Sequence, residues 1–392
     1  MTATIEFFPV GSGDMTLVRL ASGKTILIDI NIRGNADKEN EKDFPDVAAM
    51  LKNRLDRQNG IPFIDVFMLS HPDQDHISGL QNHFHLGAPS LAEEADNEKD
   101  QKILIREMWS SPLTFRRAKK EDTTTPNAEA WKEEAKRRVK MFKNKEQGAD
   151  EDGNLIRVLG DDIEHKTDGI ERLLVKTGDV FNEICREFDD TFSALLLAPK
   201  FVTDAEEADA LAGKNNTSIV IQISLASKSG EPLETKFLTG GDAEVDIWKR
   251  IWNRNKDQPE KLGYHILQTP HHCSLGSLSS DSYNDRGDQK GKGEQCVIDE
   301  EAHKALSQAE NKALIIASMD EPERESGRGL ARRKYTDIAE GQDGKMRVTM
   351  VDCKDKPLKI TITGSGPDLS GAKTARAVPP KVEKANPEGG YA

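Results

Sequence analysis

The segment Met68–Leu80, MLSHPDQDHISGL, brings four potential metal-binding side chains together within six residues. They are His71, Asp73, Asp75 and His76. The preceding apolar run, Ile61–Ser70, is typical of a β-strand, so these residues occupy the turn between a strand and a helix. Such a turn can direct alternate side chains towards one point, and imidazole and carboxylate groups are common ligands of divalent ions. Taken alone, the segment also fits a solvated turn that caps a helix.

Two later loops carry residues of the same kinds. The stretch FLTGGDAE places Asp242 directly after an apolar strand and before a helix, and TPHHCS places His271 and His272 after a third strand. An isolated Asp after a strand is usually a helix cap, and a pair of histidines is usually a loop feature. Three strand ends that all carry ligand residues are what a site for two metal ions requires, so their joint occurrence favours such a site.

Strand-like runs fall into two groups along the chain. Three runs within residues 4–30 are followed by the helical pattern FPDVAAMLKNRLDRQNG and by the strand that ends at Ser70. The second group begins with Phe192–Pro199, Thr217–Leu225 and Thr235–Ala243 and is followed by the amphipathic helix EVDIWKRIWNRN. Two groups of strands, each with helices, predict two sheets packed face to face with helices outside. The predicted fold is α/β (α+β), a four-layer αββα sandwich.

Residues 88–168 differ in composition from the rest. They are dense in charge, with one strand-like piece, Ile103–Trp109, and with the helical stretch AEAWKEEAKRRVKMF, which we expect to be exposed and stabilised by i,i+4 ion pairs. We interpret this segment as a charged, largely helical insertion in a domain that spans residues 1–362, serving as a lid or a partner surface. Residues 363–392 lack periodicity and predict a disordered tail.

Composition limits the classes of function. Apolar residues make up 36% of the chain and charged residues 31%, and no apolar run approaches the roughly 20 residues of a membrane span. The start of the chain lacks the pattern of a secretion signal, and the four cysteines form no CxxC pair, so we expect a reduced, cytoplasmic protein without membrane contact. The net charge of −13 disfavours free nucleic-acid binding, although the clusters Phe115–Lys120 and Arg328–Lys334 are locally basic.

The stretch SHPDQDH resembles the HxHxDH signature of the metallo-β-lactamase superfamily, with Asp73 in place of the second histidine. The resemblance is closest to the ComEC-like branch, which comprises the hydrolase domain of a DNA-uptake protein and its soluble relatives. The similar stretches are PVGSGDM, ILIDINI, SHPDQDHISG, TGDVFNEI, NNTSIVIQI, FLTGGDA and PHHCS, in the family's order. They run from about residue 5 to about residue 280, and the ordered set is more specific than any one of them.

This resemblance implies a site for two metal ions. It implies metal-binding roles for His71, Asp73, Asp75, His76, Asp242, His272 and His271. His71 and Asp73 would hold one ion, Asp75 and His76 the other, and Asp242 would bridge them. His272 or, as the less favoured alternative, His271 would add a ligand.

The resemblance also implies catalytic and supporting roles. Asp75 and Asp73 would be the catalytic residues, with Asp75 orienting the attacking water as well as binding metal. Asp14 and Asp29 would hold loops or ligand imidazoles in orientation. Because a carboxylate in place of an imidazole hardens the ligand set, Mn²⁺ becomes competitive with Zn²⁺, and Mg²⁺ is possible.

Two departures from the family pattern matter. HHCS replaces HHGS, and Cys273 either packs as a small apolar residue, which we favour, or adds a soft ligand. No histidine follows His303, although the family supplies a late histidine after a strand. Asp320 is a potential substitute for it. Arg328 and Lys334 lie in the basic segment that follows, where they would either bind a substrate phosphate or form a solvated face.

The sequence therefore predicts a metal-dependent hydrolase, most simply a phosphodiesterase or nuclease. A phosphodiester or nucleic-acid substrate is expected, and a protein partner that contacts the charged segment would offset the net charge of −13. An ester or lactone hydrolase of the same fold is one alternative. A non-catalytic interaction protein that retains the scaffold is another, and the sequence gives no indication of the oligomeric state.

Overall fold

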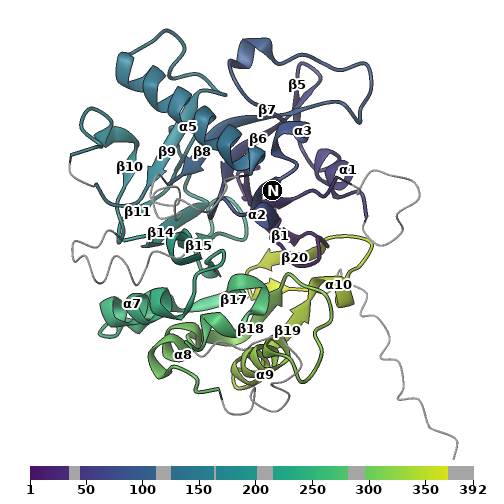
Figure 1. Ribbon diagram of the computed structural model, residues 1–392, viewed down its shortest axis with the longest axis vertical. Coiled ribbons are helices and arrows are strands. Elements are labelled where there is room, and N and C mark those ends of the chain that lie inside the picture. The colour runs from purple at the N-terminus through teal and green to yellow at the C-terminus, as the bar shows by residue number, and fades with distance from the viewer. Residues whose placement is uncertain (35–44, 112–124, 163–164, 201–214, 281–295, 370–392) are drawn as a thin grey trace, which may run out of the picture.

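The first thirty residues form three short antiparallel strands in the computed structural model, as the sequence predicts (Figure 1). The structure describes residues 1–34, 45–111, 125–162, 165–200, 215–280 and 296–369. In these parts of the chain, no helix combines the length and the apolar character that crossing a membrane demands.

The first sheet contains eleven strands. In spatial order they are β10 (Leu174–Val175), β9 (Leu155–Leu159), β8 (Ile103–Ser110), β6 (Ile61–Met68), β3 (Thr25–Ile28), β2 (Thr16–Arg19), β1 (Thr4–Phe7), β20 (Leu358–Thr363) and β21 (Gly366–Asp368), with β5 (Arg57–Gln58) on β6 and β7 (Phe84–His85) on β8. Strands β3, β6, β8, β9 and β10 run parallel, so their carboxyl ends lie along one edge of the sheet. Ligand sites of such sheets form at this edge.

The second sheet contains seven strands. In order they are β11 (Val180–Phe181), β14 (Phe192–Ala198), β15 (Val220–Leu225), β16 (Thr235–Thr239), β17 (Tyr264–Gln268), β18 (Ala309–Ala317) and β19 (Lys345–Val348). From β16 to β19 neighbouring strands are parallel. A separate hairpin pairs β12 (Glu183–Ile184) with β13 (Glu187–Phe188), and β4 (Ile30–Asn31) forms bridges to Ile77 and Ser78.

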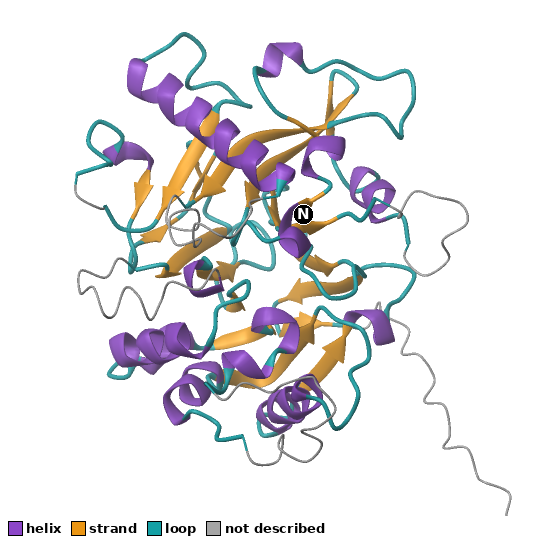
Figure 2. Ribbon diagram, viewed as in Figure 1, coloured by secondary structure: helices purple, strands orange, loops and turns teal. Residues whose placement is uncertain are grey.

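Helices accompany both sheets (Figure 2). They are α1 (Val47–Lys52), α2 (Gln74–Ile77), α3 (Leu80–His83), α5 (Pro126–Asn144), α7 (Val245–Asn255), α8 (Glu300–Leu306), α9 (Gly327–Glu340) and α10 (Thr349–Asp352). Helices α7, α8 and α9 share one hydrophobic cluster with the second sheet, and α1, α3 and α5 share another with the first. A third cluster joins the two sheets, with Phe7 and Phe237 in edge-to-face contact at 5.9 Å between ring centroids. The layers are therefore helices, sheet, sheet and helices, and the predicted α/β class is confirmed.

The described parts of segment 88–168 contribute strands to the first sheet, so they do not form only an insertion on its surface. The segment's strands β8 and β9 lie inside the first sheet, between β6 and β10. The sequence predicted β8 but not β9. Helix α5 is also less exposed than its charge suggests, because Trp131 is fully buried against Phe67 with ring centroids 4.9 Å apart. Arg138 is buried as well, and its guanidinium donates to Glu134 at 2.7 Å. A buried charged pair of this kind gives no apolar signal in the sequence.

The predicted tail also begins too early. Residues Gly366–Asp368 form β21, which pairs with β20, so strand structure extends past residue 363. The remainder of the predicted tail, 370–392, lies outside the described residues. The basic cluster Phe115–Lys120 falls outside them too.

Candidate metal centre

Backbone hydrogen bonds hold the predicted ligand loops against one another. Asp14 N–H, between β1 and β2, donates to the carbonyl of Asp75 at 3.2 Å. His271 N–H, after β17, donates to the carbonyl of Gly241, after β16, at 2.9 Å. The strand-end position of each loop thus places its side chains at a common point between the two sheets.

His76, on α2, is fixed by a carboxylate on one side and faces another. Its Nδ1 lies 2.8 Å from Oδ2 of Asp29, which follows β3. Because a hydrogen bond from Nδ1 to a carboxylate selects the tautomer with the proton on Nδ1, the Nε2 lone pair is left available. That Nε2 lies 3.0 Å from Oδ1 of Asp242. His76, Asp29 and Asp242 are all buried.

His272 approaches Asp242 from the opposite side and has a carboxylate near each ring nitrogen. Its Nδ1 lies 3.3 Å from Oδ1 of Asp14. Its Nε2 lies 3.2 Å from Oδ2 of Asp75 and 3.4 Å from Oδ1 of Asp242. The Nε2 atoms of His272 and His76 are only 3.1 Å apart. Two imidazole nitrogens and two carboxylates therefore converge within contact distance of one another.

His71 is oriented through a hydroxyl group. Ser70 Oγ donates to Asp29 Oδ2 at 2.5 Å and lies 3.1 Å from His71 Nδ1, so it accepts from that nitrogen. The Nε2 atom of His71 is 3.7 Å from Oδ2 of Asp242 and 3.9 Å from Oδ2 of Asp73. Ser70 was not among the predicted site residues, although it lies between Asp29 and the first ligand in space and directly precedes that ligand in sequence.

Asp242 divides the cluster into two halves. Its Oδ1 faces His76 and His272, as described above. Its Oδ2 faces His71 and also His271, whose Nε2 is 3.6 Å away. His271 is about a quarter exposed, whereas the other three imidazoles are buried. The structure thus brings both histidines of the pair to the carboxylate, one to each oxygen.

Unpaired buried atoms show that the cluster suits cations. His71 Nε2 and Asp242 Oδ1 are buried without a hydrogen bond of good geometry. Leaving such an atom unpaired typically costs about 1–3 kcal/mol, unless a partner is supplied. The potential ligand atoms of Asp14, His76, Asp242 and His272 all lie within 4.8 Å of one another. Because the donors are imidazole nitrogens and carboxylate oxygens, divalent ions fit the residues present.

The electrostatics of the cluster attract positive charge. Burial alone would lower the pKa of His272, but the charges of Asp242 and Asp14 raise it to about 10. The pKa of His76 is raised for the same reason by Asp242 and Asp29, against the effect of burial. His71 differs, since burial lowers its pKa to about 4 and the charge of His76 adds to this. The carboxylates therefore favour either protons or metal ions at the imidazoles.

The carboxyl groups show the complementary shifts. Burial would raise the pKa of Asp242, but the charges of His76 and His272 hold it well below the usual range. Burial likewise opposes the lowered pKa of Asp75, which results from its hydrogen bond to His272 and the charges of His76 and His272. Both groups are carboxylates near neutral pH, the form in which they bind metal ions.

The backbone around these residues is unusual. His271, His272 and Cys273 have φ values of 50°, 48° and 62°, and Asp29 has 55°. Left-handed conformation at residues other than glycine costs of order 1 kcal/mol each and is concentrated at functional sites. Three such residues in succession give the loop after β17 the turn that directs both imidazoles to Asp242.

The structure also shows the surroundings of Cys273 and of the segment after β18, where the family pattern places a late histidine. Cys273 is fully buried in the cluster with α9, and burial raises the pKa of its thiol to about 12, so it packs as a small apolar residue. After β18, Ser318 is buried and Asp320 is exposed. Asp320 is not in the group of four potential ligands given above.

The two basic residues predicted to bind substrate lie apart. Arg328, at the start of α9, is exposed and donates to Ser12 Oγ at 2.9 Å, in the loop that carries Asp14. Lys334 lies on another face of α9, near His303 of α8, where burial lowers the histidine pKa and the ammonium charge lowers it further. The structure brings Arg328 to the rim of the cluster but gives no contact between Lys334 and the cluster.

Comparisons with known proteins identify no family for this chain and one distant structural similarity among those described below. No family model matches the sequence, and no curated protein matches it. Among solved structures, the chain is similar to a point mutant of CmlA beta-hydroxylase, with a TM-score of 0.38 and 9% identity. The match covers 88% of this chain and 52% of that one, so this chain spans about half the length of that protein. A likeness of this degree assigns no activity to the chain.

Proposed function

We propose that this protein is a metal-dependent hydrolase of the metallo-β-lactamase type, specifically a ComEC-like phosphodiesterase or nuclease that uses two divalent ions. The observation that carries the proposal is the placement of Asp242, which directs Oδ1 to one pair of histidines and Oδ2 to another. A carboxylate with a different set of imidazoles at each oxygen is the arrangement expected of a bridging ligand.

The proposed ligands form two sets around Asp242. The first set would be Asp75, His76 and His272 with Oδ1, and the second Asp73, His71 and His271 with Oδ2. This assignment changes the grouping expected from the resemblance only in using both histidines of the pair. Bound divalent ions would lower the pKa of a water molecule and neutralise charge on a phosphoryl oxygen. Mn²⁺ or Zn²⁺, with Mg²⁺ as a further possibility, suits the mixed donors.

The surrounding side chains would orient these ligands. Asp29 fixes His76 directly and His71 through Ser70, and Asp14 Oδ1 lies 3.3 Å from His272 Nδ1. Partners of this kind keep the imidazole Nε2 atoms pointed inward, and their loss typically reduces metal affinity about 10- to 100-fold. Asp75 has a side chain that is 41% exposed, so its carboxylate can also accept a hydrogen bond from an attacking water.

Two features support a phosphodiester substrate. The three carboxylates of the proposed ligand sets nearly balance the charge of two divalent ions, which lets an anionic substrate approach. Arg328 provides an exposed guanidinium at the rim beside Ser12, and a guanidinium can bind phosphate in a bidentate manner. A protein partner that contacts residues 88–168 would help to present nucleic acid to a chain of charge −13. Cytoplasmic action inside a complex is part of this proposal.

An ester or lactone hydrolase with the same residues is the second candidate, and it would not require Arg328. A non-catalytic interaction protein is the third. The intact set around Asp242 opposes the third candidate, because a scaffold without catalytic function has no need of orphaned buried ligands.

A hydrolysis panel tests the proposal. It should contain single- and double-stranded DNA, RNA, cyclic dinucleotides, a generic phosphodiester and a generic lactone, each with Mn²⁺, Mg²⁺ and Zn²⁺. We expect hydrolysis of at least one phosphodiester and its loss in Asp75→Asn. A matched control is Asp246→Asn, which changes an exposed carboxylate on α7 that pairs with Lys249 at 3.9 Å. Equal activity of Asp75→Asn and the unaltered protein would refute the site, and hydrolysis of the lactone alone would favour the second candidate.

A further inference from the structure

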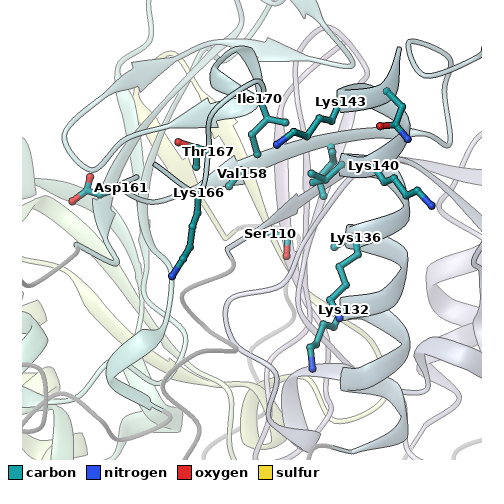
Figure 3. Close-up of a pocket in the computed structure, with 14 residues that line it drawn as sticks. Ser110, Lys132, Lys136, Lys140, Lys143, Val158, Asp161, Lys166, Thr167 and Ile170 are labelled. Carbon is teal, nitrogen blue, oxygen red and sulfur yellow. The ribbon is translucent and has the colours of Figure 1, made fainter. Parts of the chain in front are cut away.

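A cavity lies against the first sheet, and none of the residues that line it belongs to the cluster around Asp242. A cavity of about 550 Å³ lies between α5 and the segment that follows β9 (Figure 3). This volume falls within the range of about 300–1,000 Å³ that is typical of small-molecule sites. We call it the lysine groove, after the residues at its rim. They are Lys132, Lys136, Lys140, Lys143 and Lys166.

The helix phase explains how the rim forms. Lys132, Lys136, Lys140 and Lys143 recur at intervals of three and four residues, which places them on one face of α5. Figure 3 shows these four side chains along the helix, with Lys166 on the facing wall. The row from Lys132 to Lys143 spans eleven residue steps, or about 16.5 Å of helix. The four lysines therefore follow one face of α5 beside the groove.

The floor of the groove is aliphatic. Its side chains come from α5, from β9 and from the segment after β9. They are Ala135, Val139, Ile156, Val158 and Ile170. Ala135 and Val139 are only partly buried, so apolar surface remains open to an occupant. The lining residues in the described part of the chain include no aromatic side chain on which a nucleic-acid base would stack.

The charge of the groove contrasts with that of the protein. Five ammonium groups and one carboxylate, Asp161, line it, whereas the whole chain has a net charge of −13. Lys132 pairs with Glu129 at 3.2 Å in a part-buried contact, and Lys136 pairs with Glu133 at 2.7 Å in an exposed one, and such pairs near the surface contribute little to stability. Their ammonium groups can therefore turn to an anion without a large loss.

We propose that the lysine groove binds a small amphipathic anion, with an aliphatic body on the floor and a carboxylate or phosphate group held by the lysines. The aliphatic floor accounts for the body, and the excess of ammonium groups accounts for the head group. The bounded volume favours a single molecule over a membrane surface. This inference does not depend on the proposed hydrolytic function, because none of its residues belongs to the cluster around Asp242.

Calorimetric titration with alkyl phosphates tests the proposal on the unaltered protein. Octyl, decyl and dodecyl phosphate, kept below their micelle-forming concentrations, should bind at one molecule per chain. Affinity should rise about twofold to fourfold with each added methylene group until the floor is covered. Inorganic phosphate should bind at least tenfold more weakly than decyl phosphate. Dodecyltrimethylammonium, which has the same tail and the opposite charge, should not bind at this site, and equal binding of it would overturn the proposal.

Variants then locate the site. Lys136→Glu combined with Lys140→Glu should weaken decyl phosphate at least tenfold, since both side chains are exposed on α5 and their loss leaves the core intact. Lys228→Glu, in an exposed bend after β15, is the matched control and should leave the affinity unchanged. Unchanged affinity in the double variant would overturn the proposal. So would lysine-dependent binding of an oligothymidylate, or of anionic vesicles, that is tighter than that of every alkyl phosphate.

Discussion

Gly241, between β16 and Asp242, offers the sharpest test of how the cluster of Asp and His side chains is held. Its φ is 48°, and a Cβ atom added there would lie 2.5 Å from Ser70 Oγ and 3.4 Å from His71 Nδ1. Ordinary contact begins at about 3.4 Å, so Gly241→Ala requires a displacement of about 0.9 Å (3.4 Å minus 2.5 Å) between this loop and Ser70. Since Ser70 joins Asp29 to His71, the displacement falls on a residue that orients a proposed ligand.

Two contributions set the magnitude for Gly241→Ala. Alanine in left-handed conformation costs roughly 1–2 kcal/mol, and overpacking of a rigid site costs typically about 1–3 kcal/mol. We therefore expect the free energy of unfolding to fall by about 2–5 kcal/mol. Gly230→Ala is the matched control, because Gly230 has a φ of 83° with nothing within 4 Å of an added Cβ. It should show the conformational cost alone.

Urea denaturation in the presence of a chelator would measure both variants without the contribution of metal. A competition assay with a chromophoric chelator would then measure metal affinity. A misplacement of about 1 Å at a catalytic site can cost roughly 100-fold, so we expect weakened binding in Gly241→Ala and unchanged binding in Gly230→Ala. If the two variants were equally stable and bound metal equally well, the inferred contact between this loop and Ser70 would be wrong.

Three further predictions concern the surroundings of the cluster. Asp29→Asn should reduce metal affinity about 10- to 100-fold by calorimetry, because it weakens the hold on His76, and an unchanged affinity would exclude this role. In a chelator, thermal stability should fall as pH rises from 6.5 towards 10. The pKa of His272 is about 10 in the folded protein and 6.5 in the unfolded chain, so the folded state binds the proton more tightly. The resulting stabilisation is complete below pH 6.5 and is lost as the pH rises towards 10. A rise in thermal stability over this range would contradict the prediction. Arg328→Ala should lower kcat/KM for a phosphodiester about 10- to 100-fold, as expected for loss of a charged hydrogen bond, whereas Lys334→Ala should change it less than about twofold.

The loops that meet at Asp242 could be predicted from the sequence because their signals are local. An apolar strand that ends shortly before His71, or before Asp242, determines where the side chain emerges, and the fold needs only to bring the strand ends together. The sequence could not predict which oxygen of Asp242 each of the two histidines approaches. That geometry depends on three consecutive residues in the left-handed conformation, His271 to Cys273, and their residue types do not indicate this conformation.

Segment 88–168 shows where composition misleads. Its helix reads as exposed because charged residues dominate, yet Arg138 is buried and donates to the carbonyl oxygens of Leu155 at 2.9 Å and Ile105 at 3.1 Å. These acceptors lie in β9 and β8, so the charged side chain ties the helix to the sheet. Only the three-dimensional partners reveal that such a residue belongs to the interior.

Helix phase separates the two predicted substrate-binding residues. Arg328 and Lys334 are six residues apart, which corresponds to about 240° around a helix of 3.6 residues per turn. They cannot both face the cluster from α9, and the structure gives the contact with Ser12 to Arg328. The helical phase of these two residues could have been predicted from the sequence once the segment was taken as a helix.

Metal stoichiometry tests the central claim most directly, because Asp242 is proposed to bridge two ions. Elemental analysis of the folded protein after equilibration with Mn²⁺ or Zn²⁺ should give two ions per chain. Asp242→Asn should lose both, while Asp246→Asn on the neighbouring helix should retain both. One ion per chain in the unaltered protein, or two ions in Asp242→Asn, would contradict the bridging role.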